Sequence, residues 1–518
     1  MTPHATDASK PNPHPLPILG SNNPNISHPA STTRPMFSDE WPITSPSGYT
    51  VSDHMINEPP PSKAFKIAMI GAGAAGIDFL HHATHEFKGT DVEYVCFEKN
   101  HDVGGTWLEN RYPGCACDVP SASYQFPWRP KPDWSMYYSP AREIWQYMRD
   151  IVDEEGLMEY IRLRTKVCRA EWVEERSRWV VGLVESDGDG RVVREWEEEC
   201  DVLLNGNGIL NEEQKEEWRK NPEEYRKYRK MIEDELNNRF RFTLRNSKES
   251  DESNAYAYHE MRTKLGNNET LKDKIIPKNF NVGCRRPTPG NGYLEALVGE
   301  KTTCYTGTIG GITPKGFLTS DGTEVEVDVI ICATGFDTSF RPRFPIIGLD
   351  KVDIATRWEK IPETYLAVSV SNVPNYFMYN GPYGPVAQGS ILPLITLYTN
   401  HFLQIIRKMR KEHIRRLSPK ESAVKDFCEH AAIYLQRTCW ADPCSSWFKQ
   451  GRKDGNIVMW PGSRLAFFDM LAEPRFEDYE IEYWSKNRWG FMGNGFTTGE
   501  FDGDDISKYL NGRIYPDF

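Results

Sequence analysis

The sequence predicts an α/β protein with a Rossmann-type dinucleotide-binding fold, because three features occur in the order that this fold needs. An apolar strand at 65–70 runs into the glycine-rich turn Gly71-Ala-Gly-Ala-Ala-Gly76, and a helical segment at 74–85 follows. A second apolar strand at 91–97 comes next and ends at Glu98. Strand, helix and strand form a βαβ unit, and the acidic residue has the usual offset from the glycine turn.

The three glycines of the turn have separate physical roles. Gly71 allows the tight turn, Gly73 lets the backbone approach a pyrophosphate, and Gly76 lets helix and strand pack closely. The N-terminus of the helix presents unpaired N–H groups to the phosphates. Glu98 is placed to accept hydrogen bonds from the ribose hydroxyls. The turn therefore predicts a bound dinucleotide, although by itself it does not separate FAD from NAD.

Three further parts of the sequence are typical of β-structure. Residues 177–185 and 191–196 predict a hairpin closed by Asp-Gly-Asp-Gly. Residues 201–205 form a short apolar run, and residues 327–333 form another that ends in Thr334-Gly335. Continuous apolar runs of this length predict buried strands.

Helices are expected in the remaining regions. Residues 212–237 are dense in Glu, Lys, Arg and Tyr, with apolar residues spaced for a helix. Residues 247–254 predict a polar loop, and a helix is expected again at 260–274. Residues 391–406 are apolar but too short to cross a bilayer, which predicts a buried core helix.

Composition excludes several classes of protein. Hydrophobic residues make up 39% of the 518 residues, and the net charge is -12 without a long basic run beside aromatics. Nucleic acid is therefore not an expected partner. We expect no secretory signal and no membrane span, which favours a cytoplasmic protein. Eleven cysteines in that setting predict free thiols. Cys115 and Cys117 lack a second pair with ligand spacing, so no metal site is expected.

Three longer motifs resemble one family of flavoproteins. Residues 98–107, Glu-Lys-Asn-His-Asp-Val-Gly-Gly-Thr-Trp, and residues 108–118 resemble the segment along FAD in flavoproteins with two dinucleotide-binding domains. Residues 328–337 resemble the strand and turn that return to the flavin. Together they resemble the Baeyer–Villiger monooxygenase family in its fungal branch. The likeness covers residues 65–211 and 276–493.

The resemblance implies that FAD is the cofactor, and it assigns residues to that cofactor along the chain. These are Gly71, Gly73, Ala74, Ala75, Gly76, Glu98, Gly105, Thr106, Trp107, Asp118, Val119, Tyr124, Val167, Thr334 and Gly335. Val167 is expected to contact the adenine side through its backbone.

The resemblance also implies oxygen chemistry beside the flavin. In this family an anionic oxygen species attacks a ketone, and one oxygen atom is inserted next to the carbonyl. A positive group must hold that anion. Arg286, in the segment 282–290, is the best match to the family's catalytic arginine, with Arg285 as the adjacent alternative. Asp118 matches the carboxylate that orients it.

The substrate is also implied only by resemblance. Residues 373–382 are similar to the family's segment near the flavin, and several polar or aromatic side chains near them could line a pocket. The candidates are Tyr379, Asn380, Tyr383, Gln388 and Trp440. A large aromatic-lined pocket suits a bulky apolar small molecule, and the fungal branch implies a polycyclic product of secondary metabolism.

One motif of the family is missing. Its members carry a second glycine fingerprint for NADPH, but Gly266 is the only glycine between Ile209 and Val282. Bulkier residues block the close backbone approach that a pyrophosphate needs. The sequence thus predicts a Rossmann-type two-dinucleotide-binding flavoprotein with a truncated or missing NADPH domain and a helical C-terminal part. NADPH is therefore doubtful as a cofactor.

Three alternatives follow for the electron supply. The chain could be a monooxygenase that is reduced by a separate reductase or by loosely bound NADPH. It could be an FAD enzyme that its substrate reduces, as an oxidase, or that works without net redox change, as an isomerase or cyclase. It could also be a non-catalytic, truncated member of the family.

The expected domain organisation has four parts. Residues 1–60 are rich in Pro, Ser and Asn, which predicts a flexible N-terminal arm. Residues 61–211 form the first part of the FAD-binding domain, and residues 212–325 form a helical remnant of the NADPH region. Residues 326–518 form the second part of the FAD-binding domain and the substrate-side region.

Overall fold

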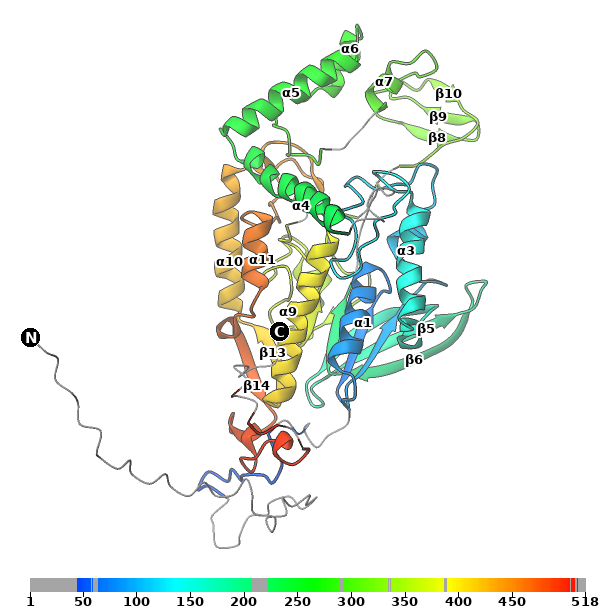
Figure 1. Cartoon of the computed structure of the whole chain (residues 1–518). Coiled ribbons are helices and arrows are strands. Elements are labelled where there is room, and N and C mark those ends of the chain that lie inside the picture. Colours follow the sequence, from blue (N-terminus) through cyan, green and yellow to red (C-terminus); the bar gives the residue numbers. More distant parts are fainter. Residues whose placement is uncertain are drawn as a thin grey trace, which may run out of the picture. The chain divides into compact units, whose positions relative to one another are not determined.

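The computed structural model describes the chain in several stretches, which divide between two compact units. The described residues are 44–56, 58, 64–206, 222–287, 292–333, 335, 337–385, 389–503, 505–507 and 510. The smaller unit comprises Met1–Pro60, Lys411–His413 and Ser485–Phe518. The larger unit comprises Pro61–Arg410 and Ile414–Trp484, and it contains the βαβ segment (Figure 1).

A parallel sheet of five strands forms the centre of the larger unit. Its strand order is β12 (Tyr376–Met378), β7 (Val202–Asn205), β1 (Lys66–Ile70), β2 (Glu93–Phe97) and β3 (Ile161–Arg162). All neighbouring strands in it run parallel. Strands β1, β2 and β7 confirm the three strands expected at 65–70, 91–97 and 201–205.

Both faces of this sheet are buried, and successive side chains alternate between the faces. Ile67 and Met69 of β1 pack in one core cluster with the neighbouring helices, whereas Ala68 packs in a second cluster. Val202 of β7 belongs to the first cluster and Leu203 to the second. Because strand side chains alternate, strands buried on both faces are continuous apolar runs, and this explains the clear signal in the sequence.

A second sheet packs against the first and contributes side chains to the second core cluster. Its order is β11 (Ile346–Ile347), β4 (Thr165–Val173), β5 (Arg178–Ser186) and β6 (Val192–Cys200). Strands β5 and β6 pair antiparallel, which confirms the expected hairpin. Asp187 holds the turn, because its Oδ1 accepts hydrogen bonds from the N–H groups of Asp189 and Arg191, each at 2.9 Å.

Helices α1 (Ala74–Glu86), α3 (Ala141–Glu154) and α9 (Leu392–Lys411) contribute to the first cluster. Helix α9 confirms the buried helix expected at 391–406, and Figure 1 shows it beside α1. The buried carboxylate of Asp78 in α1 accepts hydrogen bonds from Thr396 at 2.7 Å and Thr399 at 2.5 Å. Across the described stretches, no helix combines the length and apolarity needed to span a membrane.

Residues 222–287, the described part of the chain that follows β7, form helices. They are α4 (Pro222–Asn238), α5 (Lys248–Lys264) and α6 (Glu269–Ile275). The polar loop expected at 247–254 is wrong, because Ser247 caps α5 and its Oγ accepts the Ser250 N–H at 3.0 Å. The helix expected at 260–274 is broken at Gly266, whose φ of +56° is typical of a helix end.

The buried strand expected at 327–333 is also wrong. These residues follow β10 (Glu324–Glu326) without joining a sheet, and Val329 and Ile331 are 75% and 86% exposed. A strand that is apolar on both faces needs neighbours for its backbone groups and a cover for each face. In the five-stranded sheet the place beside β7 is taken by β12, which comes from later in the chain.

The remaining α-helices and strands that the structure describes in the larger unit are mostly short. They are α2 (Thr106–Glu109), α7 (Tyr293–Leu297), β8 (Gly311–Thr313), β9 (Gly316–Leu318), α8 (Ile354–Arg357), β13 (Ile414–Pro419), α10 (Glu421–Tyr434), α11 (Arg464–Leu471) and β14 (Tyr479–Tyr483). Strands β8, β9 and β10 form a small antiparallel sheet, and β13 pairs antiparallel with β14.

The smaller unit joins residues from near both ends of the sequence. Ile56 N–H donates to the Phe496 carbonyl at 2.7 Å, and Asn494 N–H donates to the His54 carbonyl at 2.9 Å. Most of the arm predicted at 1–60, namely residues 1–43, 57, 59 and 60, lies outside the described residues.

Candidate active site

The glycine turn after β1 excludes larger residues at its first and third glycines. Gly71 has a φ of +92°, and its N–H donates to the Phe97 carbonyl at 2.8 Å. A Cβ on Gly76 would lie 2.2 Å from the Gly71 carbonyl oxygen and 3.2 Å from Cys96 Sγ. Gly71 therefore makes the turn, and Gly76 lets α1 approach the sheet.

A second glycine turn lies against the first. A Cβ on Gly105 would be 3.1 Å from Gly73 Cα, and Gly104 N–H donates to the Ala72 carbonyl at 2.9 Å. Gly73 is the N-cap of α1, where no side chain caps the helix and the first turn carries no acidic residue. Ala74 and Ala75 follow it and are buried. This bare backbone surface with uncapped N–H groups fits the pyrophosphate of FAD.

The Glu98 carboxylate is buried against this turn. Its Oε2 accepts the Ala72 N–H and its Oε1 accepts the Asn100 N–H, both at 2.8 Å. Burial raises the pKa of Glu98, while these backbone hydrogen bonds and nearby Lys99 oppose the shift. The structure thus places Glu98 at the edge of the fingerprint turn, the position from which such folds recognise a ribose.

Residues 105–124 lead from the glycine turns past Asp118, and the stretches 107–108 and 119–124 in them are buried. Trp107 and Tyr124 are 3% and 1% exposed, and their rings meet edge to face with centroids 5.9 Å apart. Burial raises the pKa of Tyr124, so its phenol stays neutral. Thr106 begins α2 directly after Gly105, and Val119 is buried as well.

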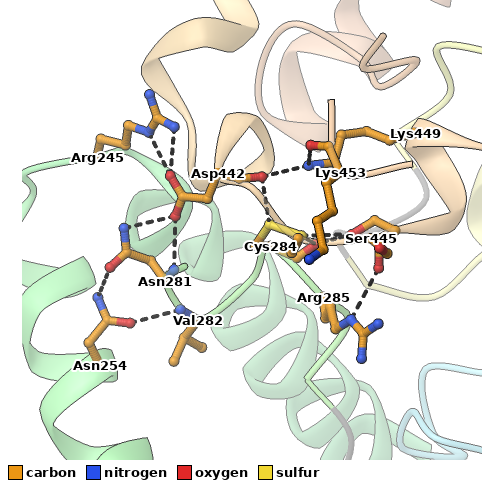
Figure 2. Close-up of a disulfide and its surroundings, with 12 residues drawn as sticks. Arg245, Asn254, Asn281, Val282, Cys284, Arg285, Asp442, Ser445, Lys449 and Lys453 are labelled. Atoms are coloured by element: carbon orange, nitrogen blue, oxygen red, sulfur yellow. Dashed lines mark hydrogen bonds and ion pairs between the residues drawn. A yellow bond between two sulfur atoms is a disulfide. The ribbon is translucent and has the colours of Figure 1, made fainter. Parts of the chain in front are cut away.

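The structure brings Arg286 and Asp118 together across 168 residues of sequence. Arg286 Nε lies 2.5 Å from Asp118 Oδ2, and Nη2 donates to Oδ1 at 2.9 Å, which makes a two-point contact. The side chains are 40% and 27% exposed. Arg285 has a different partner, because its Nε donates to the Ser445 carbonyl at 3.1 Å (Figure 2). The geometry therefore favours Arg286 over Arg285.

Comparisons with known proteins identify the family. A family model described as flavin-binding monooxygenase-like matches residues 64–188. The FAD-binding monooxygenase tazF of Aspergillus terreus (strain NIH 2624 / FGSC A1156) is 33% identical over 540 aligned positions, which cover 86% of this chain and 95% of that protein. This chain belongs to the flavin-binding monooxygenase family. It is by family an FAD-dependent oxidoreductase.

The Baeyer–Villiger resemblance is confirmed by two further comparisons. The Baeyer-Villiger monooxygenase of Pseudomonas aeruginosa (strain PAO1) is 25% identical over 80% of this chain and 91% of that protein. A closed crystal structure of cyclohexanone monooxygenase matches with a TM-score of 0.67 and 20% identity, over 81% of this chain and 100% of that chain. At that identity the structural likeness shows the fold, and it confirms the Rossmann-type class.

This family member is shorter than its relative in at least one region. The alignment with the A. terreus protein has 540 positions, more than the 518 residues here, so the relative carries residues that this chain lacks. The described residues 222–287 contain helices but no βαβ unit. Both findings agree with the missing NADPH fingerprint.

Three other cofactor candidates, Val167, Thr334 and Gly335, belong to two separate parts of the chain. Val167 is at an irregularity of β4, where it pairs with Leu183 while Arg169 pairs with Gly182. Such a bulge leaves backbone groups unpaired by the ladder. Gly335 is exposed and belongs to the segment that does not form the expected strand, and Thr334 lies outside the described residues. The structure therefore does not place Gly335 at the end of a strand in the five-stranded sheet.

The candidate substrate residues have different environments. Tyr379 and Trp440 are 4% and 0% exposed and belong to core clusters. Asn380 Oδ1 is buried and accepts no hydrogen bond from the described residues. Tyr383 lines a cavity of about 510 Å³. Gln388 lies outside the described residues.

The cavity beside Tyr383 has charged side chains in its lining besides apolar ones. Its charged lining consists of Glu363, Lys425, Glu429, Lys449, Lys453 and Asp454. Lys449 is 1% exposed and donates to the Asp442 carbonyl at 2.6 Å, and burial lowers the pKa of its ammonium. Because this lining differs from the aromatic pocket expected for a bulky apolar ligand, the cavity does not support that expectation.

The expectation of free thiols is wrong for two cysteines. Cys284 and Cys444 form a disulfide with their Cα atoms 6.3 Å apart, although 160 residues separate them (Figure 2). Both are buried, at 0% and 1% exposure. Sequence spacing does not reveal such a pairing, because only the fold brings the two segments together. None of the other cysteines that the structure describes forms a disulfide.

Sequence reasoning missed Gly206 as well as the disulfide. A Cβ on Gly206 would lie 2.4 Å from Met69 Cε and 2.7 Å from Ala75 Cβ. Its N–H donates to the Ile70 carbonyl at 3.1 Å. A glycine directly after a buried strand was the available signal, since carboxyl ends of parallel strands meet at the same sheet edge.

Proposed function

We propose that this chain is an FAD-dependent monooxygenase of the Baeyer–Villiger type, which inserts one oxygen atom beside the carbonyl group of a bulky, polycyclic ketone. The observation that carries the proposal is the two-point contact between Arg286 and Asp118. Arg286 carries a permanent positive charge, and the carboxylate of Asp118 orients it. Asp118 lies on the segment that follows the glycine turns.

FAD, when bound, supplies the electrons that activate dioxygen. In this proposal its pyrophosphate lies against Gly71–Gly76 and the N-terminus of α1, where no side chain intervenes. Glu98 uses one lone pair of each oxygen on backbone N–H groups. A carboxylate has about four acceptor sites, so Glu98 can still accept hydrogen bonds from the ribose. Trp107 and Tyr124 would lie along the flavin.

Arg286 holds negative charge on the reacting oxygen in this proposal. A guanidinium stays protonated throughout the pH range of a folded protein, and a preorganised charge stabilises an anion without reorganising. Asp118 occupies Nε and one N–H of Nη2. Among the described residues no side chain hydrogen-bonds to Nη1, so its two N–H groups remain for an anionic ligand.

Helix α4 covers the segment 118–125 that carries Asp118. The Tyr225 hydroxyl donates to the Lys131 carbonyl at 3.0 Å, and Arg229 Nε donates to the Ala122 carbonyl at 3.0 Å. Tyr225 is 4% exposed and shares a small core cluster with Ala122. Helix α4 therefore supports the backbone of the segment that carries Asp118, while the Arg286–Asp118 pair stays partly open to solvent, at 40% and 27% exposure.

A second candidate function is favoured by one observation. Residues 222–287, as described, contain no βαβ unit for a nicotinamide cofactor. The flavin could then be reduced by the substrate in an oxidase, by a separate reductase, or not at all in an isomerase or cyclase. Arg286 and Asp118 would act as electrostatic or proton-transfer groups in that case.

Anaerobic titration of the purified flavoprotein with NADPH separates these functions. Bleaching of the flavin absorbance band within seconds is the expected result for the monooxygenase. If dithionite bleaches the band but NADPH and NADH leave it unchanged, the proposal that NADPH alone drives the oxygenation is wrong. Candidate reductases and substrates are then tested as electron donors.

The oxygen insertion itself is tested with a panel of fused-ring ketones and mass spectrometry. The expected product has gained one oxygen atom, and Arg286→Ala abolishes it while FAD stays bound. Arg191→Ala is the matched control, because Arg191 lies on the hairpin turn and its side chain is 79% exposed. Equal product yields from Arg286→Ala and the parent would overturn the role of Arg286.

A further inference from the structure

The residues that precede Arg286 are anchored to a segment far along the chain. Asn281 donates from its backbone N and from Nδ2 to Asp442 Oδ2, at 2.8 and 2.9 Å. Arg245 donates from Nε and Nη2 to Asp442 Oδ1, at 2.9 and 2.6 Å. Figure 2 shows Asp442 between these groups, next to the disulfide. The carboxylate thus fixes the start of the Arg286 segment.

The disulfide is the covalent part of this anchor. Cys284 is bonded to Cys444, and the Cys284 carbonyl accepts a hydrogen bond from Ser446 Oγ at 2.5 Å. The preceding Gly283 has a φ of +96°, and a Cβ there would lie 2.9 Å from Cys439 Sγ. The backbone at 283–284 is therefore held by a bond, a hydrogen bond and close packing.

Arg286 lies two residues beyond this bond. Two residues of chain span about 7 Å at most, so fixing Cys284 restricts where the Arg286 backbone can lie. The Arg286 side chain is 40% exposed, and its described contact across the site is with Asp118. A long, half-exposed side chain is not held by packing, so the anchored backbone must bring it to its partner.

We propose that the Cys284–Cys444 disulfide is a positioning crosslink for Arg286, which keeps the guanidinium in two-point contact with Asp118. This inference rests on the role proposed above for Arg286. Both sulfur-bearing residues are almost fully buried. A buried bond is shielded from thiols in solution, so it acts as a permanent part of the site.

The first measurement is peptide mapping of the holoenzyme without reduction. Alkylation under denaturing conditions, followed by digestion and mass spectrometry, should show one linked pair containing Cys284 and Cys444. Two alkylated cysteines at these positions would overturn the proposal.

The second measurement follows reoxidation of the flavin by dioxygen, which needs no substrate. The holoenzyme is photoreduced anaerobically with EDTA and mixed with oxygenated buffer in a stopped-flow instrument. A positive group beside the flavin stabilises the developing oxygen anion, so Arg286→Ala should slow reoxidation about 100-fold. Cys444→Ser should slow it about tenfold, because small misplacements of a positioned group cost one to two orders of magnitude.

The double variant separates positioning from general stability. If the crosslink acts through Arg286, Cys444→Ser should slow reoxidation no further when it is added to Arg286→Ala. If the two substitutions slow reoxidation by the product of their separate effects, the disulfide does not act through Arg286, and the inference is overturned. Cys304→Ser is the matched control, because Cys304 is a free, half-buried thiol outside the site.

The outcomes also distinguish this inference from the proposed function. An Arg286→Ala variant that reoxidises like the parent removes the role of Arg286 itself. A slow Arg286→Ala with a normal Cys444→Ser removes only the positioning role. If Cys444→Ser does not bind FAD, the volume-filling pair Cys284→Ala/Cys444→Val replaces it. Failure of both to bind FAD would show that the bond supports the fold, which also overturns the inference.

Discussion

Gly73 and Gly76 lie in the same turn, and the structure predicts that alanine affects them in different ways. In Gly76→Ala the new Cβ would lie 2.2 Å from the Gly71 carbonyl oxygen and 3.2 Å from Cys96 Sγ. In Gly73→Ala the nearest heavy atom is Gly105 Cα, at an ordinary contact distance of 3.6 Å. The first change therefore strains the apoprotein, whereas the second leaves the apoprotein intact and obstructs only the ligand.

The magnitudes follow from these distances. Gly76→Ala requires the helix and the turn to separate by about 1 Å to reach ordinary contact, and overpacking of this kind costs about 1–3 kcal/mol. We expect the melting temperature of the apoprotein to fall by a few degrees. Gly73→Ala should change apoprotein stability by less than about 1 kcal/mol. Its methyl group occupies the surface expected to face the pyrophosphate, so FAD affinity should fall at least tenfold, or about 1.4 kcal/mol.

The assay uses the apoprotein after removal of the flavin. Thermal unfolding of the apoprotein reports the strain, and titration with FAD, followed by flavin fluorescence, reports the affinity. Gly311→Ala is the control, because a Cβ there meets no atom within 4 Å and the residue has no positive φ. It should match the parent in both measurements.

Two results would refute the reasoning. A Gly76→Ala apoprotein that melts with the parent would mean that α1 does not approach β1 as closely as the structure shows. A Gly73→Ala protein that binds FAD with unchanged affinity would mean that the pyrophosphate does not lie against this turn.

Three further predictions concern buried polar groups. Glu98→Ala should weaken FAD binding at least about tenfold, as seen by flavin loss in gel filtration, and full retention would exclude a ribose contact. Burial lowers the pKa of His401 from 6.5 to about 4. Protonation of this side chain therefore destabilises the folded state: about 3 kcal/mol of the free energy of unfolding is present above pH 6.5 and is lost as the pH falls towards 4. His401→Asn should therefore melt with a shallower pH dependence over that range, and equal slopes would contradict the assignment. Arg464, 2% exposed, donates to Glu233 at 2.8 Å and to the Ser390 carbonyl at 2.7 Å. Arg464→Ala should lower the free energy of unfolding by about 1.5–3 kcal/mol in urea titration, whereas an unchanged midpoint would show that the link between α4 and α11 is not stabilising.

The strands, turn and helix of the βαβ unit could be predicted from the sequence because their signals are local. The strand at Lys66–Ile70 is apolar because both of its faces are buried. The turn needs glycine because its backbone makes close contacts with itself at Gly71 and Gly76. The hairpin of β5 and β6 was equally clear, since its turn residues are adjacent in the chain.

Polarity alone misled the prediction at one helix. Residues 247–254 are polar, yet Ser247 begins α5 by accepting a hydrogen bond from Ser250 N–H. The helix buries little, so the apolar periodicity that identifies most helices is weak there. The capping serine is the local signal for the start of this helix.

The sequence by itself determined the dinucleotide-binding unit and, through its motifs, the family and the candidate pair of Arg286 and Asp118. Only the tertiary structure decided which strand borders β7, which cysteines pair, and how Arg286 meets its carboxylate. Residues 327–333 have the composition of a buried strand, but β12 occupies the place beside β7. Cys284 and Cys444 are 160 residues apart, so no local rule pairs them. Strand order and cysteine pairing depend on which distant segments of the chain come into contact, and such contacts form only when the chain folds.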